Sequence, residues 1–172
     1  METFQNGLVR VTILILFAVT VLSSCNRSDI NTSMPPLNFL GHKNAEDLTL
    51  TIYYKSLTAL TPFSLDADEL VNWADTHRIV ISGSQLQHHI ALLNQLSNTT
   101  VVPVGTETFL DARIYYLFET MQEGKIFEVA MWGDNHNLFV NGVEVEENDI
   151  FYDIIIPFLP KEVVVALVDR KN

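Results

Sequence analysis

The chain has 172 residues, 48% of them hydrophobic, with ten Phe, five Tyr and two Trp residues, which is enough apolar material for one packed domain and argues against global disorder. The formal net charge is −11, from 21 acidic and 10 basic side chains, and a surface of that sign disfavours both nucleic-acid binding through a basic patch and charge-driven docking on anionic lipid. The single cysteine excludes a disulfide bond within the chain.

The N-terminal part of the chain contains an apolar stretch, VTILILFAVTVL, over residues 11–22. As a helix it would be about 18 Å long, which is short for a bilayer core of about 30 Å. The length is instead typical of the hydrophobic region of a secretory signal peptide. Two small residues, Ser23 and Ser24, follow the stretch and precede Cys25.

The sequence Leu22-Ser23-Ser24-Cys25 resembles the lipobox of bacterial lipoproteins, in which an aliphatic residue and two small residues precede a cysteine. The resemblance implies that Cys25 carries a diacylglyceryl group, that a signal peptidase cleaves before it, and that the protein is anchored on the extracytoplasmic face of the cell membrane or outer membrane. Stable anchoring follows because each buried methylene contributes about 0.8 kcal/mol. One departure is the weak positive charge before the stretch, Arg10 against Glu2. The alternative is an uncleaved membrane anchor in which Cys25 has no role.

The domain organisation expected from this pattern is a signal peptide over residues 1–24, a flexible tether over 25–47 and a single domain over 48–172. The tether is polar and rich in turn-forming residues, and Pro35-Pro36 favours extended backbone. Three apolar residues of the tether offer the alternative that this segment docks onto the domain: Leu37, Phe39 and Leu40.

The first half of the domain alternates predicted strands and helices. Residues 48–54 (LTLTIYY) and 77–82 (HRIVIS) are predicted to form strands. Between them, Asp66 and Glu69 resemble a capping box, which predicts a short helix through residues 70–74. A second capping pattern, Ser84 with Gln87, precedes a predicted helix over 85–96 with one apolar stripe.

The second half is predicted to consist mainly of hairpins. Residues 99–104 are β-branched and extended, and residues 112–119 and 125–132 are predicted to pair across Glu123-Gly124. Residues 137–140 and 143–146 flank Asn141-Gly142, which favours a type I′ turn. A helix is predicted over 149–156, with prolines at its end. Residues 163–168 fit either an edge strand or a helix.

Strands joined by hairpins predict an antiparallel sheet. The expected fold is therefore α+β, a meander of about four to five strands with two or three helices packed on one face. A sheet of this kind ending in an Asn-Gly hairpin and a helix resembles small uncharacterised extracytoplasmic lipoprotein domains.

The sequence contains no nucleophile elbow, phosphate-binding glycine loop or HExxH helix, so no catalytic residue, metal site or cofactor is predicted. His88 and His89 are adjacent on a predicted helix, about 100° apart, and are expected to be one solvated and one partly buried side chain. Asp134 and His136 are interpreted as residues of a hairpin turn. The acidic run is interpreted as a solvated surface whose Glu144 and Glu146 share one face of a strand: Glu144, Glu146, Glu147 and Asp149.

Aromatic residues are abundant on the predicted strands and are interpreted mainly as core: Tyr53, Tyr54, Tyr115, Tyr116, Phe118, Trp132 and Phe151. Each adjacent tyrosine pair places one ring on each sheet face, so one face is expected to expose phenols and to offer a partner site. The leading hypothesis is a membrane-anchored binding module with no catalytic activity, whose partners are the membrane, through the lipid on Cys25, and an envelope protein. The alternative is a cell-envelope hydrolase that uses Asp134, His136 and the carboxylates of residues 144–147.

Overall fold

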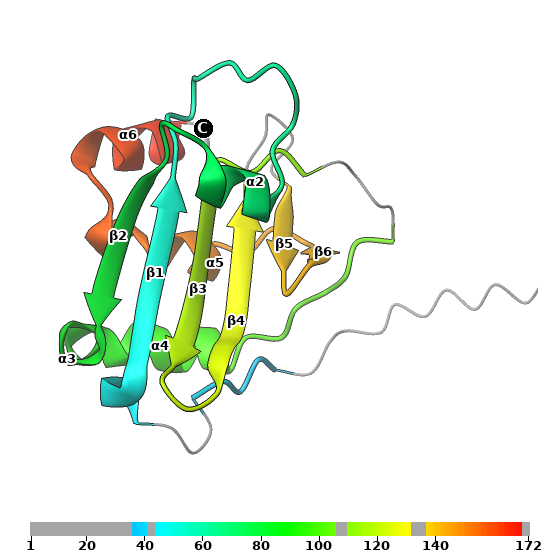
Figure 1. The fold of residues 1–172 in the computed structure, drawn as a ribbon. Coiled ribbons are helices and arrows are strands. Elements are labelled where there is room, and N and C mark those ends of the chain that lie inside the picture. Colours follow the sequence, from blue (N-terminus) through cyan, green and yellow to red (C-terminus); the bar gives the residue numbers. More distant parts are fainter. Residues whose placement is uncertain (1–35, 41–43, 106–109, 132–136, 170–172) are drawn as a thin grey trace, which may run out of the picture. The chain divides into compact units, whose positions relative to one another are not determined.

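The computed structural model describes residues 36–40, 44–105, 110–131 and 137–169, all within one compact unit, Asn31–Asn172. Its centre is a six-stranded antiparallel sheet in the order β2-β1-β3-β4-β5-β6 (Figure 1). The strands are β1 (Leu48–Tyr54), β2 (His77–Ser82), β3 (Ile114–Thr120), β4 (Gly124–Met131), β5 (Leu138–Val140) and β6 (Val143–Val145).

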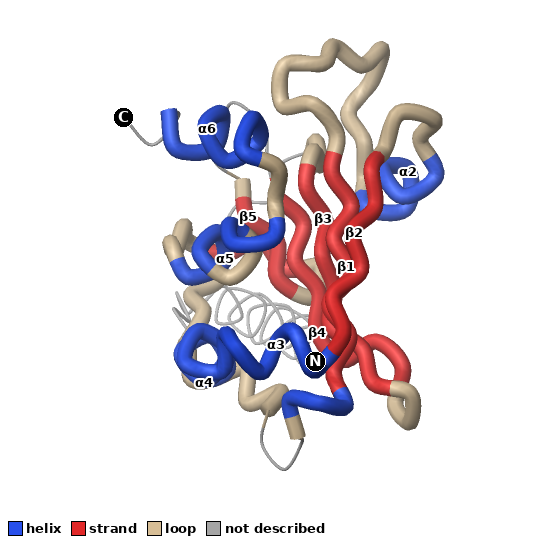
Figure 2. Tube along the Cα trace, turned by 90° about the vertical axis from the view of Figure 1, so that its left-hand side faces the viewer, coloured by secondary structure: helices blue, strands red, loops and turns tan. Residues whose placement is uncertain are grey.

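Helical segments lie on both faces of the sheet (Figure 2). Those on one face are α3 (Gly83–Leu86), η2 (Gln87–His89), α4 (Ile90–Ser97), α5 (Ile150–Asp153), η3 (Ile156–Phe158) and α6 (Lys161–Asp169). The helix α2 (Ala67–Asn72) packs on the opposite face, near the end of β1. A short turn, η1 (Ala45–Asp47), leads into β1.

Strand alternation divides the buried side chains between these two faces, because successive residues of a strand point in opposite directions. The larger core lies under α3–α6, and from the long strands it receives Leu48, Leu50, Ile52, Ile114, Tyr116, Phe118, Phe127, Val129 and Met131. The smaller cluster lies under α2 and consists of Leu65, Leu70, Ala112, Tyr115 and Ala130. Among the described segments, the larger set therefore packs on one face of the sheet, and only α2 and neighbouring residues pack on the other.

The β5–β6 hairpin closes through residues in the left-handed region, with φ of 49° at Asn141 and 78° at Gly142. Both residue types tolerate positive φ, and two such residues make the type I′ turn that the sequence predicts. The outer edge of β6 is covered, because the N–H of Val104 donates to Glu144 O and the N–H of Glu146 donates to Val102 O. The predicted extended segment 99–104 thus ends as a partial partner of β6.

The structure confirms the α+β class and the predicted bounds of β1 and β2. The sheet has six strands where four to five were predicted, because the short β5 and β6 join the same sheet as the longer strands. Residues 163–168 are part of helix α6, whose Val163 and Leu167, one turn apart, are buried in the core. The prediction that the helices cover one face holds for α3–α6 and is wrong for α2.

Two predicted helices are shorter than their apolar patterns indicate. The helix over 85–96 is interrupted by η2, and its capping box is formed by Ser82 and Gln85 rather than by Ser84 and Gln87. The helix over 149–156 ends at Asp153, after which the N–H of Ile155 donates to Tyr152 O in a tighter turn. By contrast, the capping box of Asp66 and Glu69 is present as predicted.

The part of the predicted tether that the structure describes packs against the domain. Phe39 stacks on Phe127 with ring centroids 5.2 Å apart, and Phe39 and Leu40 are both buried. The amides of Leu37 and Asn38 donate to the carbonyls of Thr99 and Ser97. The docking alternative therefore holds for these residues, and the packed structure begins before Leu48. Residues 1–35, which include Cys25, lie outside the described residues.

Candidate interaction surface

One part of the sheet face that carries α2 is not covered by other described segments. Helix α2 and the loop before it cover the end of the sheet where β1 finishes, and the rest of this face is visible between them and the β3–β4 turn (Figure 1). We call this region the open face, defined by exposed and half-buried side chains on four adjacent strands: Tyr53, Arg78, Val80, Leu117, Glu119, Lys125 and Glu128. It belongs to strands β2, β1, β3 and β4.

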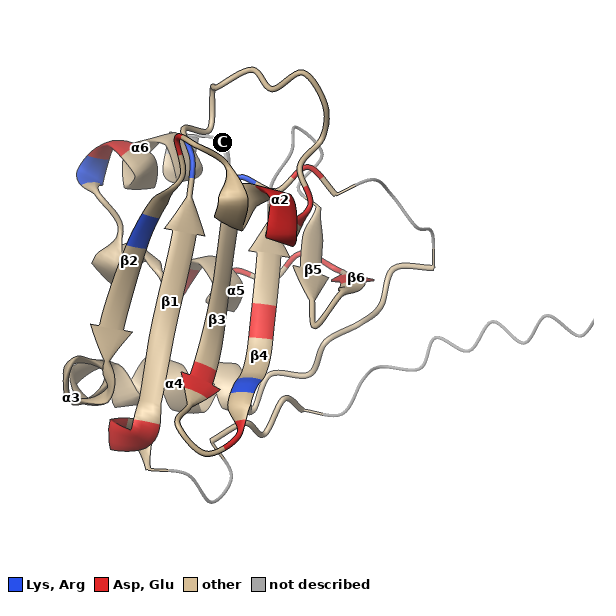
Figure 3. Ribbon diagram, in the orientation of Figure 1, with Lys and Arg blue, Asp and Glu red and all other residues tan. Residues whose placement is uncertain are grey.

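A continuous series of contacts crosses the open face. The strand register places Arg78 beside Tyr53, and Tyr53 beside Tyr115. The Arg78 guanidinium lies 5.8 Å from the centre of the Tyr53 ring, and the Tyr53 and Tyr115 rings stack with centroids 6.0 Å apart. The Tyr115 hydroxyl donates to Glu128 Oε2 over 2.6 Å, and Lys125 Nζ is also 2.6 Å from that oxygen. The series thus begins and ends with a cation (Figure 3).

The ionisation of this series is set by its own contacts. Burial, the hydrogen bond to Glu128 and nearby negative charge raise the pKa of the Tyr115 hydroxyl well above its ordinary value of 10. Partial burial opposes ionisation of Glu128, but the hydrogen bonds from Lys125 and Tyr115 outweigh it and lower the pKa of this carboxyl. At neutral pH the phenol is therefore protonated and the carboxylate ionised. That arrangement suits hydrogen-bonded recognition rather than proton transfer.

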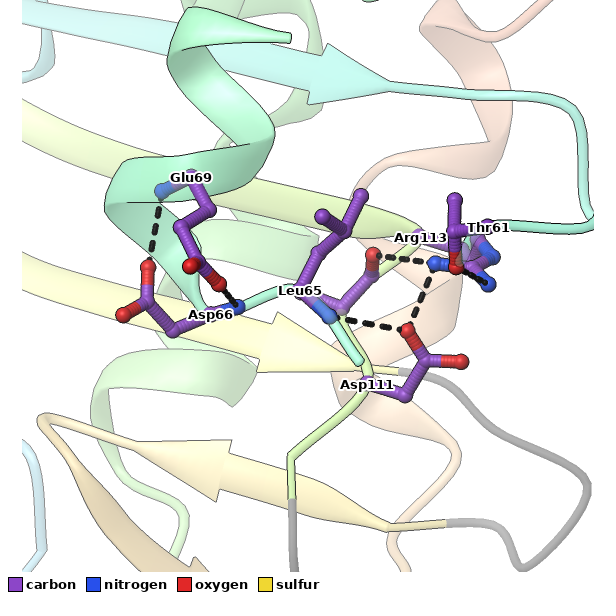
Figure 4. Close-up of polar contacts among 7 residues, drawn as sticks. Thr61, Leu65, Asp66, Glu69, Asp111 and Arg113 are labelled. Atoms are coloured by element: carbon purple, nitrogen blue, oxygen red, sulfur yellow. Dashed lines mark hydrogen bonds and ion pairs between the residues drawn. The ribbon is translucent and has the colours of Figure 1, made fainter. Parts of the chain in front are cut away.

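The border of the open face is fixed by a buried arginine at the start of β3. Arg113, 5% exposed, donates to Asp111 Oδ1 over 2.6 Å and to Thr61 Oγ1 over 2.9 Å (Figure 4). The same Asp111 oxygen accepts from the N–H of Leu65, and Leu65 O accepts from the N–H of Ala112. This network holds the loop before α2 against β3, so the open face has a defined boundary.

A second buried cation supports the same end of the sheet. Lys55 is 4% exposed, and its Nζ lies 3.3 Å from Asp75 Oδ2 and 5.7 Å from the centre of the Trp73 ring. Phe63 packs edge-on against Trp73 at 5.6 Å. Lys55 therefore joins the end of β1 to the segment after α2, and we assign it a structural role.

The predicted tyrosine pairs divide between the sheet faces as expected. Tyr53 and Tyr115 lie on the open-face side, whereas Tyr54 and Tyr116 lie on the helix-covered side. The exposure of phenols is smaller than predicted, because Tyr53 is half-buried and Tyr115 is only 7% exposed. The interpretation of the aromatic residues as core is confirmed for Tyr116, Phe118 and Phe151.

The other predicted site residues are not brought together. His88 is exposed, while His89 is half-buried with its ring 4.8 Å from that of Phe158 in an edge-on contact. Glu144 is half-buried on β6, and Glu146, which is exposed, lies one residue after the end of that strand. Trp132, Asp134 and His136 lie outside the described residues. Within the described ranges, no three His, Cys, Asp or Glu side chains are placed to hold a metal ion.

Two cavities lie at opposite ends of the sheet. One of about 740 Å³ lies where β1 begins, and its acidic lining residues are Glu46, Asp47 and Glu123. The other, of about 320 Å³, is lined by Tyr54, His77 and residues of α6. In the second cavity the hydroxyl of Ser56 is hydrogen-bonded to Thr58 rather than to His77, so no activated serine is formed.

Sequence reasoning did not identify Arg78, Lys125 or Glu128 as members of a site. Each is an ordinary charged residue on a strand, and only the register of β2, β1, β3 and β4 makes them neighbours. The predicted turn at Gly124 indicates that β3 pairs with β4, but it gives no information on the pairing of β1 and β2 with them. The irregularity in that pair between Phe118 and Glu119 would still have shifted the expected partners by one residue.

Comparison with known proteins gives no match: no protein-family model, no curated protein and no solved structure is similar to this chain. Among the described residues, no helix is both long enough and apolar enough to cross a bilayer. The features of the chain that bear on function are therefore the residues of the open face and the N-terminal sequence.

Proposed function

We propose that the protein is a lipid-anchored extracytoplasmic binding module that recognises an envelope protein through the open face. The proposal combines two observations. Leu22-Ser23-Ser24-Cys25 resembles a lipobox, and the described domain carries a bordered, partly uncovered sheet face. The observation that carries the recognition step is the contact series from Arg78 to Lys125.

A protein partner fits this series better than a nucleic acid. The open face offers donors at Arg78 and Lys125, an ionised acceptor at Glu128 and apolar area at Val80 and Leu117. Aromatic and arginine residues are enriched in protein interfaces, and charged residues such as Lys125 and Glu128 are typical of the polar rim around an interface core. The net charge of −11 also opposes binding of a polyanion.

The length of the segment between the proposed anchor and the domain fits surface attachment. From Cys25 to Pro36 the chain has 11 steps, which span at most about 40 Å when fully extended. The domain would thus remain within about 40 Å of the lipid surface, close to other envelope proteins. For the alternative of a hydrolase, Asp134 and His136 lie outside the described residues, and the described carboxylates at residues 144–147 are not part of a group placed to hold a metal ion.

The anchor is tested by incorporation of labelled fatty acid into the full chain, with Cys25→Ser as the control, and by the intact mass of the membrane form. We expect label only with the native Cys25 and a mass that lacks residues 1–24. A chain that retains Met1 and a free thiol would exclude the lipidated form.

The binding surface is tested by cross-linking in intact cells, followed by recovery of the full chain from membranes. We expect one reproducible envelope protein with the native chain, and its loss in Lys125→Glu, which also removes the ion-pair partner of Glu128. Lys161→Glu, an exposed lysine on α6, is the matched charge reversal and should retain the partner. Equal recovery with both variants would place binding elsewhere, and no recovery with the native chain would contradict the proposal.

A further inference from the structure

The outer edge of β2 differs from the other edge of the sheet. The β6 edge is covered by residues 102–104, whereas no described strand or bridge lies on the outer side of β2. β2 is six residues long, with the sequence HRIVIS, and lacks the proline and lysine residues that commonly block edge pairing. Val80 at its centre is 50% exposed. Among the described residues, this edge is therefore available for strand addition.

The hydrogen-bonding pattern shows which groups face outward. The N–H of Asn141 donates to Glu128 O, so Glu128 bonds toward β5 and Val129 bonds toward β3. In an antiparallel sheet this preference alternates along each strand. We applied this alternation along the paired residues from β4 to β3, from β3 to β1 and from β1 to β2. The N–H and C=O groups of Arg78, Val80 and Ser82 then point away from β1. The Lys55 N–H donates to Arg113 O, which agrees with the expectation that odd-numbered residues at the end of β1 bond toward β3.

We propose that β2 pairs with β2 of a second copy of this chain, antiparallel about a twofold axis at Val80, to form a continuous sheet. In this register the outward-facing Arg78 lies opposite Ser82 of the second copy, and Val80 lies opposite Val80. Each such pair exchanges two hydrogen bonds, which gives about six in total. A register centred on Ile79 pairs Arg78 with Val80 and gives about four, so the first is favoured.

Charge complementarity supports the second copy as the occupant. The beginning of β2 carries Arg78, and the end of β2 lies beside the exposed carboxylates of Glu46 and Asp47, which line a cavity with Ser82 and Gly83. Antiparallel pairing brings each Arg78 to the acidic end of the other copy, and symmetry makes this contact twice. Within one copy Arg78 and Ser82 are about 14 Å apart along the strand, so the attraction is between copies.

The dimer is expected to be weak and dependent on concentration. A single strand pair is smaller than the roughly 800 Å² per partner of a standard stable interface. Additional apolar area is available on α6, which lies at this edge of the sheet beside the start of β2 (Figure 1), because Val165 and Val168 are 47% and 44% exposed. At 0.15 M salt the repulsion between net charges is screened beyond about 8 Å. The proposal concerns the backbone edge of β2 and does not rest on the lipid anchor or on the identity of the open-face partner, although Arg78 and Val80 belong both to this edge and to the open face.

A disulfide experiment tests the twofold axis in membranes that contain the full chain. Opposed residues in a hydrogen-bonded pair have Cα atoms about 5.5 Å apart, within disulfide range. We expect Val80→Cys to give a covalent dimer under mild oxidation, at twice the monomer mass. Val143→Cys on the covered β6 edge and the native chain, whose only cysteine is Cys25, should not. A Val80→Cys chain that stays monomeric, links to another protein or dimerises no more than Val143→Cys would overturn the proposal.

A charge-swap series in sedimentation of the detergent-solubilised full chain provides the second test. Arg78→Glu should weaken the dimer at least tenfold, and Glu46→Lys with Asp47→Lys should do the same. Combining all three substitutions should restore association to near the native constant, because the attraction is re-formed with opposite sign. A native chain that is monomeric throughout, or a combined variant that is no tighter than either parent, refutes the pairing. A negative result in this series would not contradict the open-face proposal, because that proposal is tested by cross-linking to a different protein in intact cells.

Discussion

Replacement of Tyr116 by phenylalanine is expected to destabilise the domain through one hydrogen bond. Tyr116 is fully buried, and its hydroxyl donates to the carbonyl of Phe151 over 3.0 Å. In a regular helix that carbonyl would accept from the N–H of Ile155, but here the Ile155 N–H donates to Tyr152 O. Because of the tighter turn at the end of α5, the Phe151 carbonyl accepts its hydrogen bond from the Tyr116 hydroxyl instead of from the Ile155 N–H.

The magnitude follows from the burial of the acceptor. Loss of the hydroxyl leaves a buried carbonyl without this partner, which costs about 1–3 kcal/mol. For a domain of this size each kcal/mol lowers the melting temperature by about 3 °C, so the expected decrease is about 3–9 °C. The ring remains, so no large cavity is added to the cost.

Thermal unfolding of the full chain in detergent, followed by circular dichroism, measures the effect. Tyr53→Phe is the matched control, because Tyr53 is half-buried on the opposite face and its ring contacts remain. We expect the control to change the free energy of unfolding by less than about 0.5 kcal/mol. If Tyr116→Phe lowers the melting temperature no more than Tyr53→Phe does, the assigned hydrogen bond does not support the fold.

Three further predictions concern individual side chains. Thr51→Val should stabilise the domain by about 1 kcal/mol in chemical denaturation, because the Thr51 hydroxyl is buried without a hydrogen-bond partner; an unchanged midpoint would contradict this. Gly83→Ala should destabilise it by about 1–3 kcal/mol, since a Cβ at Gly83 would lie 2.1 Å from the backbone oxygen of Glu46; wild-type stability would show that η1 yields freely. The lowered pKa of Glu128 means that the unfolded chain takes up the proton first, so its stabilisation is present above about pH 4.5 and lost as the pH falls further. Stability measured at pH 7 and pH 4 should therefore fall less in Glu128→Gln than in the native chain, and an equal fall would refute the assignment.

Local sequence patterns determined most of the secondary structure of this protein. Alternation of apolar residues defined β1 and β2, Asp66 and Glu69 defined the start of α2, and Asn141-Gly142 defined the β5–β6 turn. These signals work because the favourable interactions lie within a few residues of one another. They also located the N-terminal lipobox-like sequence, whose role stays a prediction.

The tertiary structure decided the features that depend on distant residues. Residues 163–168 fit a strand or a helix by their apolar content. Burial of Val163 and Leu167, which lie one helical turn apart, favoured the helix. Local patterns also could not predict the open face, or the edge of β2 on which no described strand lies. Within the described residues, β2 pairs with β1 alone. Because β3 occupies the other side of β1 and β4 pairs with β3, Tyr115 of β3 and Glu128 of β4 lie in line with Arg78. Which residues become neighbours depends on the register between strands that are tens of residues apart in sequence. Local spacing along the chain does not predict that register.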